Sequence, residues 1–262
     1  MNVCLLVLDA GFRDLARNRW LIAYTVGFFV LAEGLFWFGG TGPQVVLSLL
    51  NLVLLVVPLV SLVFGAMHIY ASREFIELLL AQPVPRGRLF VGLYLGLALP
   101  LAAAFVAGAG IPFAINARAG ASAGSLAALL AAGCALSCAG AGLAMWIALR
   151  TDDRLAGVGA ALGAWLLTTI VYDGLVLALA AAFSDWPIER PMLALMGANP
   201  VDLARVLVLT QLDVSALMGY TGALFERTFG TALGVTVAGL GLVGWTLVPA
   251  GLAMRRFRRR DF

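Results

Sequence analysis

The sequence predicts an all-α polytopic membrane protein with six transmembrane helices, and three observations lead to this prediction. Of 262 residues, 62% are hydrophobic and 12% are charged, whereas soluble domains are about half apolar and about a quarter charged. Six apolar segments reach the roughly 20 residues that cross a bilayer core. The arginines gather on one side of these segments. We therefore treat residues 1–262 as one transmembrane domain.

The expected spans are 20–38, 45–67, 89–115, 125–149, 155–183 and 229–254. Pro100 and Pro112 predict kinks in the third span, because proline removes a backbone donor. Thirteen of the 17 arginines fall on the side that carries both chain ends. Since basic loops stay in the cytoplasm, we expect both termini to be cytoplasmic.

Residues 1–19 precede the first span and predict a helix lying flat at the cytoplasmic interface. Apolar residues recur there at helical spacing, and charged residues fill the opposite face, as in interfacial helices. The apolar face holds Leu5, Leu8, Phe12 and Leu15, and the polar face holds Asp9, Arg13, Asp14 and Arg17.

Two connections are longer than turns. The cytoplasmic one, 69–88, contains a short helix that Pro83 and Pro85 end. The outer one, 184–228, includes a fairly apolar stretch at 192–209 that carries Asn199, Pro200, Asp202 and Arg205. We expect a re-entrant or interfacial helix there, because a seventh span would move the arginine-rich tail outside.

Composition excludes several classes of function. All 17 basic residues are arginine, and a P-loop needs lysine. His68 is the single histidine, so paired-histidine metal and haem sites are excluded. The net charge of +3 is no nucleic-acid signal, because the charges lie at membrane boundaries. We expect no metal, cofactor or catalytic site on this chain.

The cytoplasmic connection carries an amphipathic helix. Phe75, Leu78 and Leu79 share one face, while Arg73, Glu74 and Glu77 lie elsewhere. Such a helix suits a groove on a soluble partner. An ordinary interfacial helix explains the pattern equally well.

Glu33 and Asp173 are ionisable residues within expected spans. A charge at the bilayer centre costs about 2.5–3.5 kcal/mol on insertion scales, so such residues usually face protein or water. They are candidates for a transport path or a gate. Alternatively, both lie near the outer interface, where the cost is small.

Two pairs of sulfur-containing residues lie one helical turn apart. Cys134 and Cys138 share a face of the fourth span, and Met192 and Met196 share a face near the outer surface. Soft sulfur ligands suit Cu(I), and thiols also carry sulfur by exchange. Ordinary buried packing explains both pairs more simply.

Residues 72–96, SREFIELLLAQPVPRGRLFVGLYLG, resemble the loop and following span of ABC-2-type transporter permeases. The resemblance implies an exporter-like (type V) fold in a bacterial inner membrane. It also implies a homodimer driven by two separate cytoplasmic ATPase subunits, which bind the ATP and Mg²⁺. The residues that it places at the ATPase contact are Arg73, Glu74, Phe75, Glu77, Leu78 and Gln82.

Ala198-Asn199-Pro200-Val201-Asp202 with Arg205, and residues 218–222, MGYTG, resemble the branch of this family that serves the maturation of a copper–sulfur enzyme centre. This implies movement of a sulfur species, or support of copper delivery. It also implies a periplasmic partner on the outer loops, in contact with Met192, Met196, Asn199, Asp202 and Arg205. The alternatives are export of haem, lipid, drug or polysaccharide, and a non-transport scaffold for a maturation complex.

Overall fold

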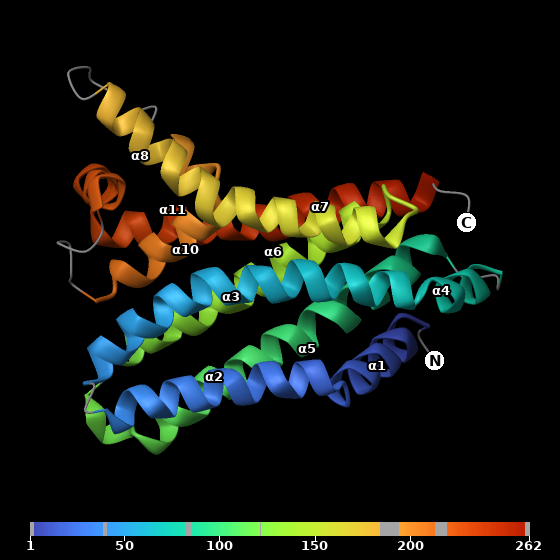
Figure 1. Cartoon of the computed structure of the whole chain (residues 1–262), viewed down its shortest axis with the longest axis horizontal. Helices are drawn as coiled ribbons and strands as arrows, with labels where there is room; N and C mark the ends of the chain where they lie inside the picture. The colour runs from blue at the N-terminus through green and yellow to red at the C-terminus, as the bar shows by residue number, and fades with distance from the viewer. Residues whose placement is uncertain are drawn as a thin grey trace.

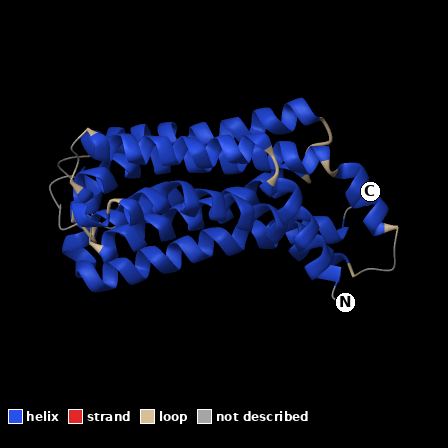
Figure 2. Ribbon diagram, turned by 90° about the horizontal axis from the view of Figure 1, so that it is seen from below, coloured by secondary structure: helices blue, strands red, loops and turns tan. Residues whose placement is uncertain are grey.

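The computed structural model describes residues 3–38, 41–81, 85–120, 122–183, 194–212 and 219–259, and across these ranges it contains helices and no strand. The long helices run side by side along one axis (Figure 1). Both chain ends and the short helix α4 lie together at one end of this bundle, which we call the terminal end. A view turned by 90° shows the same parallel arrangement (Figure 2).

Within the described residues, six helices are long and apolar enough to cross a membrane, which confirms the predicted fold class. They overlap the six expected spans in order. Five segments are α2 (Arg19–Trp37), α3 (Gly42–Ala71), α5 (Arg86–Ile115), α6 (Ala123–Ala148) and α11 (Gly219–Arg259). The fifth span is composite: α7 (Arg154–Leu166) continues through the π-helix η2 (Leu167–Val171) into α8 (Tyr172–Ala182).

Polar caps start several of these helices. The Asn18 side chain accepts a hydrogen bond from the backbone N–H of Trp20 at 2.9 Å, and Asp153 accepts from Leu155 N and Ala156 N at 3.1 Å each. Ser122 caps α6 in the same way. A short 3₁₀ helix, η1 (Ala117–Ala119), precedes Gly120, whose positive φ of 81° reverses the chain. Caps stabilise a helix start by about 1 kcal/mol each, so they define where the spans begin.

Small residues let the central helices approach closely. A Cβ added to Gly65 would lie 2.9 Å from Ala144 Cβ, and one added to Gly140 would lie within 2.8 Å of Ser61 Cβ. Both contacts join α3 to α6. Gly142 packs against Ala250 of α11. The small-residue spacing around 140–142 therefore serves contacts within the subunit.

The peripheral helices leave apolar surface uncovered. In the most apolar window of Arg154–Ala182, 11% of the residues are buried, against 61% in Arg86–Ile115. Because lipid tails are as apolar as leucine side chains, such a surface fits either lipid or another membrane helix. α8 diverges from the rest of the bundle in Figure 1.

The first helix is α1 (Val3–Ala16). Of its expected apolar face, Leu15 is buried and Phe12 is exposed, and Val7, which is not assigned to that face, is also buried. The reason is a close backbone approach, in which a Cβ on Gly11 would lie 3.3 Å from Gly96 Cα. Because of this glycine pair, the face of α1 that carries Val7, Gly11 and Leu15 packs against α5, and Phe12 points away from it.

The connection between the fifth and sixth spans contains α10 (Pro200–Leu209). Nine of its ten residues are buried, and it packs against α6 and α11. Asn199 caps its first turn by accepting from Val201 N at 3.0 Å, and Pro200 occupies the first helical position, which suits proline. This buried segment fits a re-entrant helix.

Candidate functional site

The structure separates the candidate residues into two groups, one at the terminal end and one where α8 meets α10. The terminal group belongs to α4 (Arg73–Leu80). Its Ile76 is buried, and Leu79 and Leu80 pack against the core. The opposite face presents Phe75 and Leu78, 47% and 69% exposed, with Glu74 and Glu77 also exposed. Gln82 lies outside the described residues.

Arg73 does not share this exposed face. Its guanidinium donates to the backbone carbonyls of Ala148, Thr151 and Asp152 at 3.1, 2.7 and 2.8 Å. It also lies over the ring of Tyr70, 4.5 Å from the centroid. The side chain is 25% exposed. Arg73 therefore binds the C-terminal end of α6 within its own subunit.

Tyr70 reinforces the same junction. Its hydroxyl donates to the Thr151 carbonyl at 3.0 Å. Gly157 of α7 lies directly against this hydroxyl, since a Cβ at position 157 would overlap the Tyr70 side chain. The end of α3, the start of α4 and the turn between α6 and α7 thus meet at one point.

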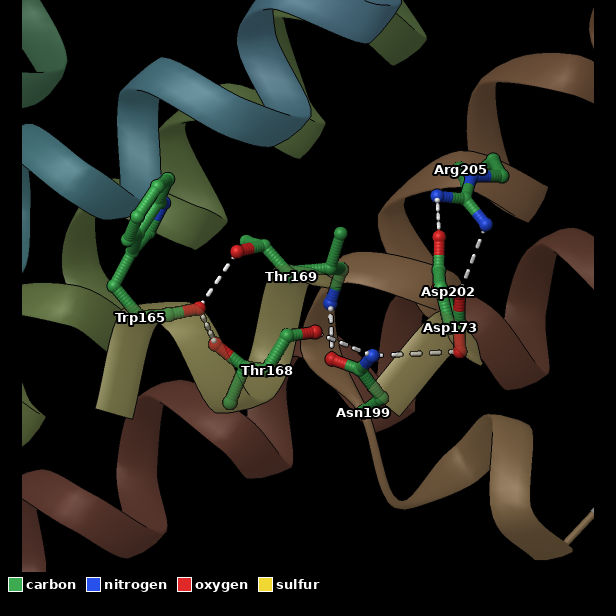
Figure 3. A network of polar contacts seen from close by, with 8 residues as sticks. Trp165, Thr168, Thr169, Asp173, Asn199, Asp202 and Arg205 are labelled. Carbon is green, nitrogen blue, oxygen red and sulfur yellow. Dashed lines mark hydrogen bonds and ion pairs between the residues drawn. The ribbon is translucent and has the colours of Figure 1, made fainter. Parts of the chain in front are cut away.

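The second group is a polar network around η2 (Figure 3). Arg205 of α10 donates to Asp173 of α8 at 2.7 Å and to Asp202 of its own helix at 3.1 Å. Asn199 donates to the Thr168 carbonyl in η2 at 2.9 Å. π-Helical turns interrupt regular helix geometry and occur often at functional sites. The network therefore ties the irregular turn of the fifth span to α10.

Two further hydrogen bonds hold the segment before α10. Tyr172 donates through its hydroxyl to the Leu195 carbonyl at 2.6 Å, and Trp245 donates through Nε1 to the Gly197 carbonyl at 3.2 Å. These bonds come from α8 and α11 respectively. Residues 194–199 are therefore anchored on both neighbouring spans.

The residues expected to contact an outer partner lie inside the subunit. Asn199, Asp202 and Met196 are buried, and Arg205 is half-buried. The physical reason is that α10 turns back into the bundle, so its polar side chains satisfy one another rather than an external surface. Met192 lies outside the described residues.

Glu33 accepts a hydrogen bond from Asn116 Nδ2 at 3.0 Å. Asn116 caps the end of α5, and Glu33 lies one turn before the end of α2. Both helix ends face away from the terminal end (Figure 1). Glu33 therefore lies near the end of its span that is opposite the terminal end.

Cys134 and Cys138 are both half-buried and free on α6. Tyr94 donates to the backbone carbonyl of Cys138 at 3.1 Å. In the described part of the chain, no group of three or more His, Cys, Asp or Glu side chains is placed to hold a metal ion.

Sequence reasoning missed several of the partners of these candidate residues, among them Tyr70, Asn116, Thr168 and Thr151. Tyr70 and Asn116 carry no motif. Thr151 and Thr168 take part through backbone carbonyls, which every residue has. The Asn199-Pro200 start of a helix was the one visible local signal, because it combines a capping residue with proline.

The sequence matches the family described as ABC-2 family transporter protein over residues 5–262. The chain belongs to the ABC-2 transporter family. It is 28% identical over 264 residues to a protein of Pseudomonas aeruginosa named "Probable ABC transporter permease protein NosY", with 94% of each chain covered. It is 29% identical over 269 residues to the protein of the same name from Stutzerimonas stutzeri, covering 94% of this chain and 95% of that one.

Family and fold agree on a multi-pass membrane permease similar to NosY. A permease of this family is a transport subunit, and an ABC transporter includes an ATPase. The exposed face of α4 and the network around η2 are therefore interpreted below in terms of transport.

Proposed function

We propose that this ABC-2 permease works in a NosY-like system. In that system it moves a sulfur species, or supports copper delivery, for the copper–sulfur centre of nitrous oxide reductase. Two separate NosF-like ATPase subunits, which bind ATP and Mg²⁺, supply the energy. The support is similarity to two NosY proteins along 94% of the chain.

The exposed face of α4 is the single observation that carries the ATPase contact. Glu74 and Glu77 lie beside Phe75 and Leu78 on a surface that the rest of the described chain does not cover. A short helix that presents apolar anchors with flanking charges suits a groove on a soluble protein. Its position beside both termini, at the arginine-rich end, supports a cytoplasmic location in the inner membrane.

The uncovered side of α7 supports a homodimer. Gly159 and Gly163 have open space where a side chain would be, and they lie one helical turn apart. Small residues at this spacing let membrane helices approach closely. Gly157 is excluded from this role because it packs on Tyr70. We assign the dimer seam to the α7 face that carries Gly159 and Gly163.

A NosD-like periplasmic protein would sit at the end opposite α4. The burial of Asn199 and Asp202 leaves them unsuited to direct contact with such a partner.

The deciding experiment deletes this gene in its host and complements it with the wild-type chain. The readout is the absorption spectrum of the copper–sulfur centre in purified nitrous oxide reductase, with nitrous oxide reduction as the second readout. We expect the centre to be lost on deletion and restored on complementation. A reductase that retains its centre without this chain would overturn the proposal and favour a permease for haem, lipid, drug or polysaccharide.

A second strain separates transport from a scaffold role. It carries the wild-type permease with an ATPase variant that binds but does not hydrolyse ATP. A transporter predicts loss of the centre, because the cargo no longer moves. A scaffold predicts normal assembly.

A further inference from the structure

We propose that Arg73 is the mechanical connection between the coupling helix α4 and the fifth span, rather than part of the surface that binds the ATPase. This inference rests on the proposed function, because it concerns how a push on α4 reaches the membrane. Its structural basis is the junction of Arg73 with the turn between α6 and α7.

The guanidinium of Arg73 donates hydrogen bonds to three backbone carbonyls at that turn. It donates to Ala148 O, the last residue of α6, and to Thr151 O and Asp152 O in the turn, at 2.7–3.1 Å. Asp152 is also within 3.9 Å through its carboxylate. Residue 153 then caps α7. Thus Arg73 contacts the end of α6 and two residues of the turn that leads to α7.

The chemistry of this contact requires arginine. The last carbonyls of a helix have no partner within the helix and carry partial negative charge. A planar guanidinium has five donors in a fixed fork and can bind several such carbonyls at once, whereas lysine presents a compact point charge. The ring of Tyr70 lies beneath the guanidinium, and the Tyr70 hydroxyl donates to Thr151 O. Together these contacts limit the guanidinium to one orientation.

The turn leads directly into the helix that ends at the polar network. α7 begins at Arg154, and Trp165 near its end donates to the Leu55 carbonyl of α3 at 2.9 Å. The chain then enters η2 and Asp173, which pairs with Arg205. A displacement of α4 that moves Arg73 therefore also moves the start of α7. Through α7 it moves the π-helical turn η2, which is hydrogen-bonded to the start of α10.

The test follows two reporter positions in the complete complex with its ATPase, reconstituted in nanodiscs. In a background of Cys4→Ser, Cys134→Ser and Cys138→Ser, a spin label is placed at Ala81→Cys, the residue that ends α4, or at Leu155→Cys on α7. Both positions are exposed, and Ala81 is not among the residues assigned to the ATPase contact. The change in label mobility on adding ATP with vanadate is measured at each position. The variant is Arg73→Gln, and the matched control is Arg17→Gln, an exposed arginine at the same end.

We expect Arg73→Gln to keep ATPase binding and the response at position 81, but to reduce the response at position 155 at least fivefold. The control is expected to keep both responses. An unchanged response at 155 would overturn the inference. Loss of ATPase binding, or of the response at 81, would overturn it too, because Arg73 would then belong to the docking surface.

Arg73→Lys provides the second variant if Arg73→Gln fails to assemble. Lysine keeps the charge but lacks the planar set of donors, so the response at 155 is expected to fall while that at 81 remains. A normal response at 155 with lysine would contradict the inference. Absence of both responses in the unsubstituted complex would instead contradict the ATPase-driven transport proposed above.

Discussion

Arg205 Nη2 lies 2.7 Å from Asp173 Oδ2, so one ion pair joins the fifth span to the helix that follows it. The same guanidinium also binds Asp202, whose side chain is 9% exposed. Two carboxylates from different helices therefore depend on one cation. This arrangement makes Arg205 the most consequential polar residue of the α8–α10 region.

Arg205→Gln is expected to lower the free energy of unfolding by about 2 kcal/mol, because it leaves a buried carboxylate without its cation. The estimate is below that for a fully buried pair, since Arg205 and Asp173 are about one-third exposed. Thermal unfolding in detergent measures the effect. Arg118→Gln, an exposed arginine on η1, is the control and should change stability by less than about 0.5 kcal/mol. Equal unfolding temperatures for the two variants would contradict the prediction.

Asn199→Ala removes three hydrogen bonds at once: the cap of α10, the bond to Thr168 O, and a longer bond of 3.4 Å to Asp202. A lost cap costs about 1 kcal/mol, and the Thr168 bond adds about 1 kcal/mol. Asn18→Ala is the matched control, because Asn18 caps α2 through one exposed bond. We expect the loss at 199 to be about twice that at 18 in the same thermal assay. A smaller loss of stability at position 199 than at position 18 would show that the bond from Asn199 to Thr168 O contributes nothing.

Glu74→Arg with Glu77→Arg is expected to abolish ATPase binding, because it reverses the charge of the exposed α4 face. Exposed substitutions of this kind change folding stability by about 0.5 kcal/mol or less. Co-purification with the tagged ATPase is the measurement. Asp9→Arg with Asp14→Arg, on the exposed side of α1, is the control. Normal recovery of the ATPase with the α4 variant would remove α4 from the contact.

Cys134→Ser with Cys138→Ser is expected to leave maturation of the reductase intact, because half-buried thiols on a packed helix are explained by packing alone. The absorption of the copper–sulfur centre is the measurement, compared with the wild-type chain at matched expression. Loss of the centre would assign these thiols to sulfur or copper handling.

Gly159→Leu with Gly163→Leu is expected to weaken the homodimer at least tenfold, because bulky side chains prevent close helix approach. Dimer content is measured by single-molecule photobleaching in nanodiscs. Gly239→Leu with Gly244→Leu on α11 is the control, since these glycines also have open space around them. A wild-type dimer fraction in the α7 variant would move the seam to another face.

The sequence by itself determined the number of spans, their approximate positions and the location of the short amphipathic helix α4. These features follow from long apolar runs, arginine distribution and amphipathic spacing, all of which act locally along the chain. It also indicated the helix at Asn199-Pro200. Family resemblance carried by residues 72–96 agreed with the match over residues 5–262.

Only the tertiary structure decided which polar groups meet. The structure turns Arg73 away from the exposed face of α4 and onto carbonyls 75 to 79 residues away along the chain. It also pairs Asp173 with Arg205 and draws Asn199 inside. Such pairings depend on where α10 and the α6–α7 turn lie in space. Arg73 donates to backbone carbonyls, and Asn199 donates to the backbone carbonyl of Thr168. Because every residue carries that carbonyl, its role becomes visible only when the fold brings a donor to it.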